Sequence, residues 1–149
     1  MPFLEAGFGA AIITPPTPVQ LAGFIDDQPA TEVHDDLEVR ALFLRGEHGS
    51  VCLLVCDLLG LSPRFANPVR DAVAAALDLE RPAVLTSCIH THAGPSTLEG
   101  AHLLGWITPD GYLDTLVQRC VAAALAARDA ATSATLRAGR WPLPEGLSI

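Results

Sequence analysis

The chain has 149 residues, half of them hydrophobic, which is enough for one globular domain with a core and too few for two. Its 17 acidic residues outnumber nine arginines, lysine does not occur, and the formal net charge is −8. Because nothing supplies the basic clusters that phosphate backbones or anionic lipids require, nucleic acid is not an expected partner.

The ends and the hydrophobic runs of the chain bear on where the protein resides. The first residues lack the basic and apolar regions of a signal peptide, and no run of about 18 apolar residues occurs. We therefore expect no transmembrane segment and a cytoplasmic location. The four cysteines lie among apolar neighbours rather than at zinc-finger spacing, so they are expected to be buried free thiols.

The first half of the chain predicts three strands and a helix. Residues 6–13 form an apolar run that ends at a proline-rich segment, since proline cannot donate a hydrogen bond to a sheet. Residues 37–45 and 50–59 are rich in Leu, Val and Phe around a glycine-containing turn, which predicts a hairpin. Residues 63–79 begin with proline and repeat apolar positions at helical spacing.

The second half completes an α/β pattern. Residues 83–89 predict a buried strand that returns parallel to 50–59 through the intervening helix. Residues 110–130 carry an i, i+3, i+4 apolar stripe, which indicates a long helix, and 134–140 are expected to form a last strand. The fold class predicted for residues 1–149 is therefore α/β, a single domain with a mixed β-sheet flanked by helices.

The most informative segment is 89–95, Ile-His-Thr-His-Ala-Gly-Pro, at the carboxyl end of the predicted buried strand. In an extended strand, His90 and His92 would project from one face with Cα atoms roughly 6.5–7 Å apart. Imidazole is a common zinc ligand and titrates near neutral pH, so one ring suits a metal and the other suits a substrate or a proton. Two solvated surface histidines are the alternative at this point.

Other polar residues leave two interpretations open. Asp57, near the end of its strand, is placed either to orient one of the histidines as an outer-shell carboxylate or to cap the following turn. Segments 14–36, 57–62 and 90–105 are expected to form the mouth of the site. His34 and His48 are expected on the solvated surface, and His102 in apolar packing or a lid.

A cysteine hydrolase built on Cys88 and His90 is a further alternative. A nucleophile and its base normally come from different structural elements, whereas these two residues are neighbours on one strand. The geometry therefore disfavours this alternative.

Five sequence pieces in one order resemble the amino-terminal part of the neutral/alkaline, non-lysosomal ceramidase family. The first resembles Gly-x-Gly-x-Ala-Asp-Ile-Thr-Pro of that family, and the last resembles Thr-His-Thr-His-Ser-Gly-Pro. Three positions differ from these patterns, with Ile at 12 and 89 and Ala at 93. The matching pieces in this sequence are 7–15, 21–24, 33–41 (Val-His and Arg-Ala), 56–58 and 89–95.

The resemblance implies a zinc-dependent amidohydrolase that cleaves the N-acyl amide of a ceramide-like lipid or another N-acyl substrate. His90 would be a zinc ligand, His92 a catalytic residue facing the substrate, and Gly23 part of the substrate pocket through its backbone. Because the family takes its other ligands from later segments, the chain is expected to be a truncated amino-terminal portion. The alternative is a non-catalytic remnant or assembly module, with self-association possible through surfaces that the missing part would cover.

Overall fold

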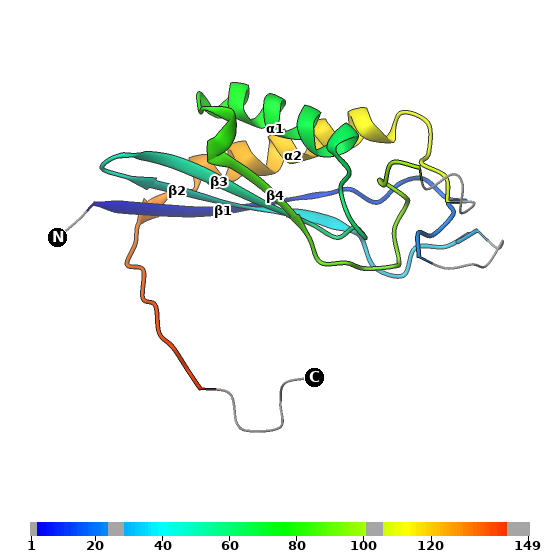
Figure 1. Cartoon of the computed structure of the whole chain (residues 1–149), viewed down its shortest axis with the longest axis horizontal. Coiled ribbons are helices and arrows are strands. Elements are labelled where there is room, and N and C mark those ends of the chain that lie inside the picture. Colours follow the sequence, from blue (N-terminus) through cyan, green and yellow to red (C-terminus); the bar gives the residue numbers. More distant parts are fainter. Residues whose placement is uncertain (1–2, 24–28, 101–105, 143–149) are drawn as a thin grey trace.

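The computed structural model describes residues 3–23, 29–100 and 106–142. Within them the chain forms one five-stranded sheet in the order β4-β3-β2-β1-β5, with both long helices on one side of it (Figure 1). The pair β3–β4 is parallel and the other pairs are antiparallel, so the sheet is mixed as predicted. The strands are β1 (Leu4–Ile12), β2 (Glu38–Gly46), β3 (Gly49–Cys56), β4 (Val84–Cys88) and β5 (Thr132–Ser133).

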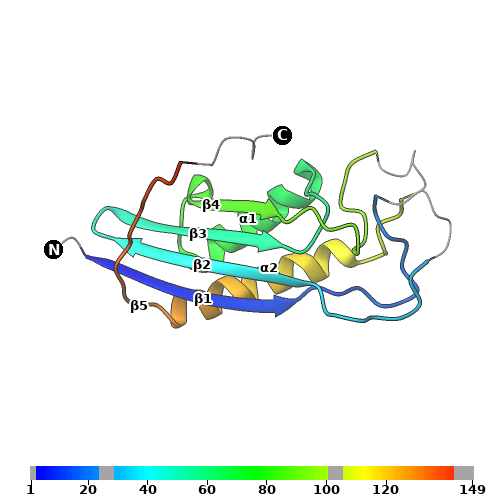
Figure 2. The same ribbon diagram turned by 90° about the horizontal axis from the view of Figure 1, so that it is seen from below.

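The central strands and helices lie close to where the sequence predicts them. Helix α1 (Pro63–Leu77) connects β3 to the parallel β4 through a 3₁₀ turn (Arg81–Ala83), which completes the expected βαβ unit. Helix α1 begins with proline at its first turn and ends at Asp78, whose φ is 54°. Helix α2 (Tyr112–Asp129) lies alongside α1 on the same face of the sheet (Figures 1 and 2).

The core lies between the sheet and the two helices. Alternate residues of β2 and β3 are buried there, among them Phe43 and Leu54, and α2 contributes Leu116 and Cys120. Strand β1 instead presents glycines to α2: a Cβ on Gly7 would lie 2.0 Å from the carbonyl oxygen of Ala127. The helix backbone therefore approaches β1 closely because these positions lack side chains.

The other face of the sheet carries no helix (Figure 1). We call it the open face and define it by the strand residues that alternate with the buried ones. It is mostly apolar, and several of its side chains are strongly exposed, Phe8 by 73% and Leu85 by 51%. The apolar residues of the open face are Leu4, Ala6, Phe8, Ala10, Ile12, Leu42, Leu44, Val51, Leu53, Val55 and Leu85.

Two sequence expectations differ from the structure. The predicted last strand at 134–140 is wrong, because pairing with β1 is confined to Thr132 and Ser133 and the chain then leaves the sheet. The predicted strand 83–89 is shorter, since β4 ends at Cys88 before the histidines. All four cysteines are free, as expected, although Cys88 is only partly buried. Across the described residues, none of the helices combines the length and hydropathy needed to cross a bilayer.

Candidate functional site

The two histidines lie in a loop at the carboxyl end of β4, where ligand sites of open α/β sheets commonly form. Their ring centroids are 5.4 Å apart and the ring planes are inclined at 74°, so the rings meet edge to face. The sequence placed both on an extended strand, but His90 has a φ of 67°. This left-handed residue turns the chain immediately after β4, and the rings converge by a loop bend instead of strand alternation.

Backbone hydrogen bonds fix this loop to the segment that follows β3. The N–H of Ile89 donates to the carbonyl of Cys56 at 3.2 Å, and the N–H of His90 donates to the carbonyl of Leu58 at 3.1 Å. Both segments leave the parallel strands β3 and β4 at the same edge of the sheet. The parallel pairing therefore positions the histidine loop against residues 57–60.

The ring of His90 has a defined hydrogen-bond partner. Its Nδ1 lies 2.9 Å from the carbonyl oxygen of Leu59. Because a carbonyl oxygen only accepts, Nδ1 must carry the proton, and Nε2 of the neutral ring keeps its lone pair. A metal-binding histidine commonly donates its other ring N–H to a carbonyl in this way, and His90 is solvent-exposed. The tautomer is thus the one that a metal ligand at Nε2 requires.

Gly23 lies directly against the ring of His92. A Cβ at position 23 would be 2.1 Å from Nδ1 of His92, and the glycine has a φ of 93°. The neighbouring residue Ala22 donates its N–H to the carbonyl of Gly94 at 2.8 Å, which ties the two loops together. The structure therefore brings together three of the residues singled out from the sequence, His90, His92 and Gly23.

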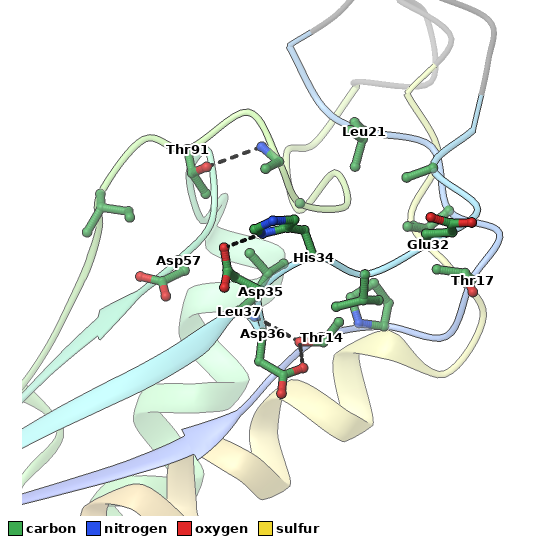
Figure 3. Close-up of a pocket in the computed structure, with 17 residues that line it drawn as sticks. Thr14, Thr17, Leu21, Glu32, His34, Asp35, Asp36, Leu37, Asp57 and Thr91 are labelled. Carbon is green, nitrogen blue, oxygen red and sulfur yellow. Dashed lines mark hydrogen bonds and ion pairs between the residues drawn. The ribbon is translucent and has the colours of Figure 1, made fainter.

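A pocket of about 380 Å³ opens beside the histidine loop (Figure 3). Its walls come from segments 14–21, 30–37 and 89–94, together with Asp57. The loop contributes Ile89, Thr91 and Ala93 to this wall, while His90 and His92 are not among the lining residues. The expected mouth is therefore found for most of its segments, and the histidines lie next to the pocket rather than within it. His102 and residues 101–105 lie outside the described residues.

His34 lies on the solvated surface, as predicted, and also in the pocket wall. It was expected on the solvated surface, and it is indeed exposed, with Nδ1 2.7 Å from a carboxylate oxygen of Asp35. It also lines the pocket, across from Thr91 in Figure 3. The predicted mouth segment 14–36 includes His34, and the Val33-His34 piece of the family resemblance is the other sequence signal for it. His48 lies exposed in the hairpin turn, as predicted.

The pocket floor is held by Thr14. Its hydroxyl donates to a carboxylate oxygen of Asp36 at 2.8 Å and accepts the N–H of Leu37 at 2.8 Å. The segment after β1 is thereby fixed to the start of β2. No sequence argument had assigned a role to this threonine.

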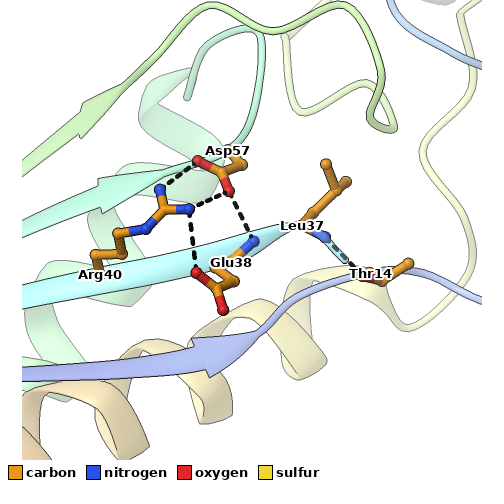
Figure 4. Close-up of polar contacts among 5 residues, drawn as sticks. All are labelled: Thr14, Leu37, Glu38, Arg40 and Asp57. Carbon is orange, nitrogen blue, oxygen red and sulfur yellow. Dashed lines mark hydrogen bonds and ion pairs between the residues drawn. The ribbon is translucent and has the colours of Figure 1, made fainter. Parts of the chain in front are cut away.

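Asp57 is engaged with β2 (Figure 4). Its carboxylate accepts hydrogen bonds from the guanidinium of Arg40 at 2.8 and 3.1 Å and from the N–H of Glu38 at 3.0 Å. Glu38 also pairs with Arg40 at 3.0 Å. The hydrogen bond with Asp57, and then its charge, raises the pKa of Arg40. Both carboxylate oxygens thus fasten the end of β3 to β2, and a role in orienting a histidine stays a prediction.

The thiol of Cys88 does not suit nucleophilic catalysis. Burial, and then the neighbouring Cys56, raises its pKa to about 12. The thiolate is the reactive form of cysteine, and near neutral pH this thiol stays protonated. The structure therefore gives no support to a hydrolase built on Cys88.

The described residues hold no cluster of three or more His, Cys, Asp or Glu side chains arranged to bind a metal ion. Nevertheless, the donor chemistry of His90 fits zinc, since its proton is on Nδ1 and Nε2 faces away from the carbonyl. A protein zinc site needs at least three ligands, so His90 and its neighbour can supply only part of one.

Comparison with known proteins identifies the fold. No protein-family profile matches the chain, and no curated protein matches it by sequence. Among solved structures, the chain is similar to neutral ceramidase from Pseudomonas aeruginosa, with a TM-score of 0.70 and 19% identity. It is also similar to a structure described as ceramidase complexed with C2, with a TM-score of 0.71 and 18% identity.

Each match covers 89% of this chain and 22% of the ceramidase chain. The protein therefore has a ceramidase-like α/β fold, as the sequence resemblance predicted, and it spans about a fifth of the length of these ceramidases. At this level of identity the likeness establishes the fold and not the activity.

Proposed function

We propose that this fold carries part of a zinc-dependent amide hydrolase site, with a ceramide-like lipid or another N-acyl compound as substrate. The observation that supports the proposal best is the arrangement of the two rings. His90 is held in the tautomer that leaves Nε2 available, and the ring of His92 lies 5.4 Å from it. The ceramidase-like fold supports the same class of chemistry.

In this proposal His90 is a zinc ligand, and zinc, when bound, would polarise an amide carbonyl and lower the pKa of a water molecule. His92 would stabilise the oxyanion or transfer a proton, because an imidazole ring can both donate and accept a hydrogen bond. Gly23 allows the ring of His92 to lie directly against its backbone, where a side chain would displace it. The proposal requires further zinc ligands from residues beyond those that the structure describes.

The pocket beside the loop is a candidate for holding part of the substrate. Its volume of about 380 Å³ falls within the range of small-molecule sites. Apolar residues such as Leu21 and Val33 line it together with His34 and Thr14. This mixture suits a substrate with both a hydrocarbon chain and polar groups. A cytoplasmic location remains part of the proposal.

The test is zinc content together with hydrolysis of N-acyl amides of varied chain length. His90→Asn keeps a side-chain N–H near the position of Nδ1, tolerates the positive φ and removes Nε2, so it isolates metal ligation from folding. Because the described residues supply only part of a zinc site, the ion is added in excess and its binding is measured by titration. We expect the wild type to bind the added zinc, His90→Asn to bind it more weakly, and His48→Ala, which changes an exposed histidine in the hairpin turn, to bind it like the wild type. A folded wild-type protein that takes up no added zinc would contradict the proposal.

A non-catalytic binding module is the second candidate. One observation favours it: no cluster of three metal-binding side chains occurs among the described residues. In this case zinc would be absent from the well-folded protein, and His90→Asn would change neither metal content nor hydrolysis.

A further inference from the structure

The open face is the largest apolar feature that the proposed site does not use. Its centre is one row of side chains that crosses four strands. Strand register pairs Phe8 with Leu42, Leu42 with Leu53, and Leu53 with Leu85. Since residues paired in register project from the same face, these four large side chains form a continuous apolar band across the sheet.

Charge is confined to one end of this face. Within β1 to β4, the charged residues that alternate with the buried ones are Glu38 and Arg40. Arg40 pairs with Glu38 and with Asp57. The remaining positions are apolar, apart from Ser87 and the strand-end glycines Gly46 and Gly49. A surface of this kind resembles the inner face of a two-sheet sandwich more than a solvated face.

The area of the open face suits pairing of two sheets. Strands about 4.8 Å apart, with about 3.3 Å per residue, give four strands of up to nine residues a planar footprint of about 400–500 Å². Covering this footprint on two copies removes roughly 800–1,000 Å² from water, which is close to the lower limit of about 1,000 Å² for a specific interface. A patch of this size lies within the range of the largest apolar patches on monomers, which are often functional.

We propose that the open face packs against the same face of a second copy of this chain, with the two sheets stacked about a two-fold axis through the Phe8 row. In such an interface the side chains of the Phe8 row meet the same row of the second copy, and residues on one side of the row meet those on the other side. The sheets cross at about 30° and lie about 10 Å apart. A lipid surface is the less suitable occupant, because the chain carries a net charge of −8 and no lysine.

The segment that follows β5 also favours an interface on the open face. It leaves the sheet on the side opposite the helices (Figure 1), and its Leu136 and Trp141 are 77% and 91% exposed. In a dimer through the open face, these exposed apolar side chains would lie on the side that the second copy occupies. Their burial would add to the area removed from water.

The experiment measures the mass of the 149-residue chain in solution by light scattering and sedimentation velocity from roughly 1 to 200 μM, the range expected for an interface of this size. We expect twice the monomer mass of 15.7 kDa at the upper concentrations. Phe8→Glu and Leu85→Glu place a charge on the apolar band, twice per dimer, and should raise the dissociation constant at least about 100-fold.

The matched control is Ile107→Glu, which adds the same charge at a side chain that is 61% exposed near α2, on the helical side of the sheet. It should dimerise like the wild type, and circular dichroism should show all variants folded. A wild-type monomer throughout, a dimer that both open-face variants retain, or open-ended assembly would each overturn the proposal. Binding to phosphatidylcholine vesicles by a monomer, lost in Phe8→Glu, would overturn it in favour of a lipid surface.

Discussion

The contact between Gly23 and His92 gives a sharp test of the site geometry. In Gly23→Ala the new Cβ would lie 2.1 Å from Nδ1, 2.5 Å from Cε1 and 2.7 Å from Cγ of His92. Ordinary contact requires about 3.5 Å, so the nearest edge of the ring has to move by about 1–1.5 Å. These three atoms all belong to the side chain of His92, and we therefore expect the ring to move while the backbone stays in place.

The energetic cost has two parts. Alanine at a φ of 93° costs about 1 kcal/mol of backbone strain, and an off-rotamer histidine costs about another 1 kcal/mol. A loss of about 2 kcal/mol lowers Tm by about 4–8 °C in a chain of this size. Gly100→Ala is the matched control, because Gly100 also has a positive φ, 76°, and no atom within 4 Å of its new Cβ. It should lose only the strain, about 1 kcal/mol.

The assay is the long-range ¹H–¹⁵N correlation of the imidazole rings, read beside thermal unfolding. In Gly23→Ala the His92 signals should shift, while those of His48 in the hairpin turn stay fixed. In Gly100→Ala neither should shift. If the proposed function also holds, an ångström of displacement should lower hydrolysis by about 10²-fold. Unchanged His92 signals in Gly23→Ala would refute the contact on which the site is built.

Two further predictions concern packing and titration. Gly9→Ala would place a Cβ 2.3 Å from the carbonyl oxygen of Ala123, a helix backbone atom, so urea unfolding should show a loss of about 2 kcal/mol in the free energy of unfolding. Gly46→Ala is the control, because its new Cβ has its nearest neighbour at 3.7 Å, and it should cost under about 0.5 kcal/mol. Equal losses in the two variants would contradict the close approach of α2. Because the pKa of Cys88 is raised to about 12, iodoacetamide should alkylate it at pH 7.5 at least about 100-fold more slowly in the folded than in the unfolded chain. The thiol of the unfolded chain loses its proton at lower pH than that of the folded chain, so folding stability should fall as pH rises from about 8.5 towards 12. Rapid alkylation of Cys88 in the folded chain, detected by peptide mapping, would refute the raised pKa.

The strands and helices could be predicted from sequence where the spacing of apolar residues was compatible with one type of secondary structure. The stripe along 112–129 and the hairpin around Gly46 and Gly49 left no comparable alternative, and the structure confirms both. Strand β1 shows the limit of this reasoning. Its large residues, Phe8 and Ile12, face outward, while Gly7 and Gly9 face the helix. Alternation identifies two faces but does not say which is buried when the inner face has no side chains.

The segment after α2 was mispredicted for a related reason. Residues 134–140 alternate in a way compatible with a strand, but a strand also needs a partner with free backbone groups. The register pairs β1 with β5 only at two residues, Glu5 with Ser133 and Ala6 with Thr132. The local sequence pattern does not show how many residues of this segment can pair with β1.

The site was predicted in composition more than in geometry. The rule that residues i and i+2 share a face brought His90 and His92 together, and they do meet, but through a left-handed residue that the rule does not include. The tautomer of His90 depends on a carbonyl 31 positions earlier in the chain, at Leu59, and no local pattern specifies such a contact. His34 likewise reaches the pocket only because the loop 30–37 folds across it.

Asp57 connects the pocket with the open face. Its carboxylate lines the pocket, and it holds Arg40, whose side chain is 52% exposed at the charged end of the open face. In the proposed dimer Arg40 would lose water, which strengthens its attraction to Asp57 and also costs the hydration of the guanidinium. Because the same carboxylate also accepts the N–H of Glu38, a stronger pair holds the start of β2 more firmly against the end of β3. The pocket wall is attached at this point, so a dimer in which the attraction gained exceeds that desolvation cost would also order the pocket, and an ordered pocket would favour the dimer.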